Sequence, residues 1–98
     1  MFRSRFKPIV ESQLDLFASQ NGDLLKRIAD SLDEYNSAER DEAEELFGEY
    51  MDAHAVAAEI LEEMRDHYAR TLEDDEEYVD TFNRAVKKRW PVTATELD

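Results

Sequence analysis

The chain has no cysteine, only two glycines and two prolines, and no long uninterrupted apolar run. Without cysteine, disulfides, zinc knuckles, iron–sulfur clusters and thiol nucleophiles are excluded. Gly22 and Gly48 are isolated from each other, so no glycine-rich phosphate loop, dinucleotide fingerprint or nucleophile elbow can be written. No segment approaches the roughly 18 apolar residues that a membrane-spanning helix needs, and Met1–Ile9 is not followed by the apolar stretch of an export signal. We therefore expect a soluble, cytoplasmic protein of a single domain.

Acidic residues dominate the charged residues of the chain. The formal net charge is −13 over 98 residues, and residues 36–80 hold seventeen Asp or Glu against three Arg. Such an acidic body repels nucleic acid and anionic lipid, so we expect neither a nucleic acid nor a membrane as a direct partner. The carboxylates are interpreted as a solvated helix surface, and the alternative is an acidic DNA mimic that inhibits a DNA-binding protein.

Helical periodicity is the strongest signal in the sequence. From residue 37 to residue 72 there is no proline, and apolar residues recur every three or four positions, which is typical of one amphipathic helix. Asn36 and Glu39 have the spacing of a capping box at its start. The stripe comprises Ala43, Phe47, Tyr50, His54, Ala57, Leu61, Met64, Tyr68 and Leu72.

Shorter periodic segments flank the long one. They predict helices at about 8–20, 23–35 and 75–90, with a basic arm at 1–7 and a loose tail at 91–98 after Pro91. Gly22 leaves open whether the first two segments are one kinked helix or two. The predicted fold is all-α: a three- or four-helix antiparallel bundle, coiled-coil-like, with one long central helix.

The length of the central helix indicates self-association. At 1.5 Å per residue it would span roughly 54 Å, and the shorter helices cannot cover both of its halves. An apolar strip around Leu46, Phe47 and Tyr50 would stay exposed, so we expect a second copy to cover it in an antiparallel dimer or a larger symmetric assembly. The predicted interface residues are Leu46, Phe47, Tyr50, His54, Ala57 and Leu61.

Metal binding is the one chemical function that the residues suggest. Ferritin-like sites use a Glu followed by a His three residues later, and this chain has no such pair. Glu59, Glu63 and His67 are instead spaced by four, and His54 lies on the apolar stripe itself. These four residues are the candidates to bind a divalent or iron-type metal. The alternative interpretation places Glu59, Glu63 and His67 on a solvated face and His54 in the core.

The sequence therefore favours a function without catalysis and without a cofactor. The expected role is a helical protein–protein interaction module, such as a small scaffold, adaptor or regulatory subunit. The alternatives are a carboxylate and histidine metal-binding bundle, for storage or oxidation, and the DNA-mimic inhibitor. The pathway and the identity of any protein partner cannot be derived from these residues.

Overall fold

The computed structural model describes residues 4–98, which form helices and turns and contain no β-strand. Within these residues five helices follow one another, so the all-α prediction is confirmed. Their bounds are α1 Lys7–Gln20, α2 Gly22–Asn36, α3 Ala43–Ala69, α4 Glu76–Arg89 and the single turn α5 Pro91–Ala94.

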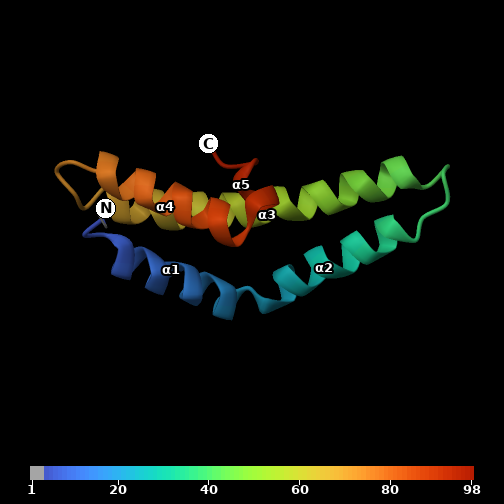
Figure 1. Cartoon of the computed structure of the whole chain (residues 1–98), viewed down its shortest axis with the longest axis horizontal. Helices are drawn as coiled ribbons and strands as arrows, with labels where there is room; N and C mark the ends of the chain where they lie inside the picture. Colours follow the sequence, from blue (N-terminus) through green and yellow to red (C-terminus); the bar gives the residue numbers. More distant parts are fainter. Residues whose placement is uncertain (1–3) are drawn as a thin grey trace.

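The helices build an elongated molecule with extents of 51 × 27 × 21 Å. Helices α1 and α2 run end to end along one side as a shallow bow, α3 returns beside them, and α4 runs back along the part of α3 that follows its midpoint (Figure 1). Helix α5 then lies across the middle of α3. No helix within residues 4–98 is both long enough and apolar enough to cross a membrane.

Asn21 divides the first two helices. Its backbone leaves the helical region, with φ −121° and ψ 33°, and its side-chain amide donates a hydrogen bond of 2.9 Å to the carbonyl of Phe17. The backbone N–H of Asn21 donates to the same carbonyl at 2.9 Å, so the helix ladder is kept and the side chain shares its acceptor, a contact of the kind that often bends helices. A side chain at the neighbouring Gly22 would meet no atom within 4 Å, so the break follows from Asn21 rather than from crowding at the glycine.

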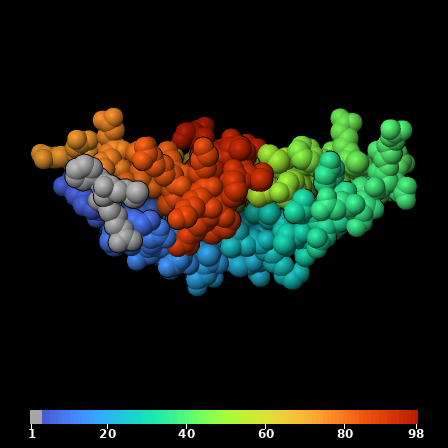
Figure 2. Space-filling view, in the orientation of Figure 1, coloured from blue at the N-terminus to red at the C-terminus, as the bar shows by residue number. Residues whose placement is uncertain are grey.

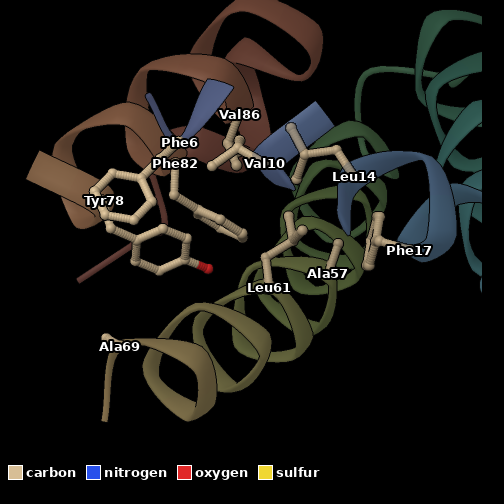
Figure 3. Packing of buried hydrophobic residues seen from close by; sticks show 10 residues of the cluster. All are labelled: Phe6, Val10, Leu14, Phe17, Ala57, Leu61, Ala69, Tyr78, Phe82 and Val86. Atoms are coloured by element: carbon tan, nitrogen blue, oxygen red, sulfur yellow. The ribbon is translucent and has the colours of Figure 1, made fainter. Parts of the chain in front are cut away.

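The hydrophobic core lies where α1, α3 and α4 come together. Phe6, Val10, Leu14 and Phe17 from the first segment meet Ala57, Leu61 and Ala69 of α3 and Tyr78, Phe82 and Val86 of α4 (Figure 3). Aromatic pairs contribute to this core. Phe6 packs edge-on against Tyr78 at 5.6 Å, and Phe17 packs edge-on against Trp90 at 5.2 Å, measured between ring centroids. Such pairs add to the burial of large apolar surfaces.

Three expectations about segment limits were wrong. The long helix begins at Ala43 rather than 37, because α2 continues through Asn36 and residues 37–42 form the turn that reverses the chain into α3. Segment 91–98 is not loose, since Pro91–Ala94 is helical and Thr93 is buried. Of the predicted arm 1–7, residues 1–3 lie outside the described residues, while Phe6 is buried in the core and Lys7 begins α1.

Candidate functional site

His54 is buried at the junction where α5 crosses α3. Its Nδ1 lies 2.7 Å from the hydroxyl of Thr93, and the ring of Tyr50 stands edge-on to it at 4.6 Å between centroids. Its Nε2 is buried without a hydrogen-bond partner in the described part of the chain. Burial lowers the pKa of His54 from its ordinary value of 6.5, and the negative charge of Glu96 acts weakly in the opposite direction.

Arg65 anchors the end of the chain beside this junction. The side chain is buried, and its guanidinium donates to the Oδ1 of Asn83 and to the main-chain oxygen of Asp98, each at 3.0 Å. It also donates to Asp66 at 2.8 Å, and Glu62 accepts a hydrogen bond of 2.8 Å from the amide of Asp98. Pairing of the buried guanidinium on several sides offsets the cost of removing its charge from water.

A ladder of rings continues from His54 along α3 and across to α2. Phe47 lies 6.3 Å from Tyr50 and 5.3 Å from Tyr35, measured between ring centroids. Phe47 is 46% exposed, and Leu32 of α2 is 38% exposed. From here on, the arm means the two-helix part formed by α2 and residues 43–52 of α3, and not the predicted basic arm at 1–7. We call the surface of Leu32, Tyr35, Leu46, Phe47 and Tyr50 the arm face.

The predicted interface residues divide into two groups at this junction. His54, Ala57 and Leu61 are at most 6% exposed, because other parts of the same chain cover them, so a second copy cannot contact them without rearrangement. Leu46 and Tyr50 are half-buried, and Phe47 is exposed. Only this second group remains accessible on the surface.

The four weak metal candidates are not assembled. His54 is buried and bonded to Thr93, whereas Glu59, Glu63 and His67 lie on exposed positions of α3. Within residues 4–98, no group of three or more His, Asp or Glu side chains is arranged to hold a metal ion. The geometry of a single copy therefore gives no support to the metal-bundle alternative.

Two grooves follow the side of α3 between it and the bowed first pair of helices. The groove against α2 holds about 510 Å³, and its lining carries five carboxylates against two cations. The groove between α1 and α3 holds about 620 Å³ and has an apolar floor of Leu16, Ile60, Met64 and Tyr68. Its remaining lining residues are Gln13, Gln20, Asn21, Glu63, His67 and Arg70.

Arg89 at the end of α4 fastens that helix to α1. Its guanidinium contacts Glu11 at 2.7 Å and Asp15 at 2.8 Å. The hydrogen bond from Arg89, with a second from Lys7, lowers the pKa of the Glu11 carboxyl below its usual 4.5. This cluster positions α4 and leaves no unpaired charge aimed into a cavity, so it has the character of a structural tie.

Sequence patterns did not predict three residues that hold α4 and the C-terminal segment on α3, namely Thr93, Arg65 and Asn83. Arg65 falls in step with Leu61 and Ala69 on the buried stripe, and a cation in apolar phase was the available signal. Thr93 and Asn83 carry no comparable pattern.

No known protein family matches the chain, and comparison with curated proteins and with solved structures gives no match.

Proposed function

We propose that this protein is a non-catalytic helical interaction module, a small scaffold, adaptor or regulatory subunit, and that it self-associates through the arm face. The observation that carries the proposal is the absence of any buried residue in α2 and in residues 43–52 of α3. Helices in proteins owe most of their stability to packing of an apolar face in the tertiary structure. The arm has such a face but no third layer.

The arm face continues the surface that the rest of the chain covers elsewhere. In Figure 2 the orange and red layer of α4 and the C-terminal segment stops near the middle of the molecule, and the teal and green arm extends beyond it. The ring ladder runs from beneath that layer, at His54, out to Phe47. Contiguous exposed apolar surface is typical of interaction sites, and this supports the proposal.

A second copy of the chain is the occupant we propose. Two arms laid face to face about a two-fold axis would place two α2–α3 pairs against each other, which is the arrangement of a four-helix bundle. Each Phe47 would then lose its contact with water. The two-fold axis allows the same residues to serve both copies, so the surface needs no foreign partner of matched shape.

Substitution of Phe47 by Glu tests the proposal. Sedimentation velocity across micromolar concentrations should show that the variant assembles less than the parent, because two carboxylates would be forced into the shared apolar layer. Ala55→Glu is the matched control, since it adds the same charge to an exposed position of the same helix. Circular dichroism of both variants separates loss of assembly from loss of folding.

Native mass spectrometry of the untagged protein reads the assembly, bound metal and accompanying chains together. A metal-free homo-oligomer that Phe47→Glu dissociates supports the interaction module. A parent protein that is monomeric at tens of micromolar contradicts self-association through the arm. A stoichiometric metal would instead redirect attention to the carboxylate and histidine alternative.

A further inference from the structure

The groove between α1 and α3 is a second unfilled place in the molecule, separate from the arm face. Helix α1 packs on α4, and the backbones of α1 and α3 stand apart on the side away from α4. Leu16 at its rim is 50% exposed, which is the largest exposure among the large apolar residues of the described chain. With Ile60 and Met64 on the opposite wall, it forms an apolar trough along α3.

Charge distinguishes this groove from the rest of the surface. The chain carries a formal charge of −13, so two copies repel each other over most approaches. Among Asp, Glu, Lys and Arg, the lining of this groove contains one acid, Glu63, and one cation, Arg70, so its formal charge from these residue types is zero. The neighbouring groove against α2 has five carboxylates against two cations and is a poor place for a second acidic copy.

The two charged lining residues are also placed for self-pairing. Glu63 lies on α3 and Arg70 directly follows its last residue, so the two are seven residues, or about two turns, apart, and both line the groove. If two α3 helices cross in antiparallel fashion near His67, each Glu63 faces the Arg70 of the other copy. A surface in which residue i meets j and j meets i is the requirement for a two-fold interface.

We propose that this groove is a second self-association surface, whose occupant is another copy of the chain crossing α3 against α3 around His67. This second contact rests on the proposed function, and it makes the assembly larger than a dimer. One two-fold contact uses the arm face and the other uses the groove, so four copies close into a tetramer when the two axes meet at right angles. Leu16, Ile60 and Met64 of both copies fill the trough.

Substitution of Leu16 by Glu tests the groove independently of the arm. Sedimentation equilibrium of the parent should give four times the 11.5 kDa mass of the chain. Leu16→Glu and Phe47→Glu should each leave dimers, and the double variant should be monomeric. Ser19→Glu, which adds a charge to an exposed position of α1 outside the groove, should keep the parent assembly.

A charge swap tests the identity of the occupant. Glu63→Arg and Arg70→Glu should each release the groove contact, because like charges then face each other across the two-fold axis, and the double variant should restore it. Glu73→Arg, an exposed reversal outside the groove, should have no effect. Restoration by the double swap requires that both residues meet across copies, which a foreign helical partner would not reproduce.

The outcomes separate the two proposals. A parent dimer that Phe47→Glu dissociates and Leu16→Glu leaves intact overturns the groove and keeps the arm. A parent dimer with the opposite response overturns the arm and keeps the groove. If the single swaps dissociate nothing, or the double swap fails to restore what they dissociate, the α3 crossing around His67 is wrong.

Discussion

The two ends of the molecule are built from the same kinds of helix but differ in how many layers they have. At one end α1, α3 and α4 enclose Leu14, Phe17 and Phe82 with no exposed surface. At the other, α2 and the first turns of α3 pack as a pair and bury no residue. The difference teaches that a helix pair closes no core by itself, and that the third element decides which apolar residues are available to a partner.

Truncation of one phenylalanine at each end gives the largest expected contrast. Phe82→Ala should lower the free energy of unfolding by about 3–5 kcal/mol, because it removes a fully buried ring and leaves a cavity. Phe47→Ala should cost the isolated chain about 1 kcal/mol or less, since the ring is 46% exposed. Urea unfolding at low protein concentration measures both, and equal losses would contradict the division into two unlike ends.

The junction between the two ends supplies a smaller effect. Thr93→Val preserves shape but leaves Nδ1 of His54 without its partner, so the free energy of unfolding should fall by about 1–2 kcal/mol. Combining it with His54→Leu should recover part of that loss, because two apolar groups need no hydrogen bond. Additive losses in the double variant would show that the contact contributes nothing of its own.

The dependence of the unfolding free energy on pH that comes from His54 is the smallest effect we expect. The pKa of His54 is lowered by burial, so below its usual value of 6.5 the unfolded chain binds a proton more readily than the folded one. The contribution of His54 is therefore fully present above pH 6.5 and is lost as the pH falls toward the lower folded pKa. The unfolding free energy of the parent should drop in this window, and His54→Leu should flatten the drop.

The control for this experiment is the other histidine of the chain. His67 is exposed on α3, so His67→Gln should keep the dependence on pH that His54→Leu removes. A flattened curve in the His67 variant, or an unchanged one in the His54 variant, would assign the effect to groups outside the junction. Both proteins should be compared at one low concentration, because assembly also shifts apparent stability.

Periodicity predicted the helices well and their coverage poorly. The stripe through His54, Ala57 and Leu61 identified the buried face of α3. A stripe shows that a face is apolar and says nothing of what lies against it. The stripe alone therefore indicates a second copy at His54, Ala57 and Leu61, although the chain covers these residues itself.

Local signals also failed at two places, the chain reversal between α2 and α3 and the segment after Pro91. Asn36 and Glu39 have capping-box spacing, yet the chain reversal between α2 and α3 occupies residues 37–42 and moves the helix start to Ala43. After Pro91 the sequence has no periodicity, yet Thr93 bonds to His54, 39 residues away, and Asp98 bonds to Arg65 and Glu62. These contacts join residues far apart in sequence, so the pattern of the segment itself does not predict them.

Hydrogen exchange at two protein concentrations compares the two ends of the molecule directly, because it measures both in one sample. Amides of α4 should be protected to the same extent at low and high concentration, since their core lies within the chain. Amides of α2 should exchange quickly when dilute and become protected when concentrated, as a second copy covers the arm face. Strong protection of α2 at every concentration would contradict the account, because it would show that the arm is stable without a partner.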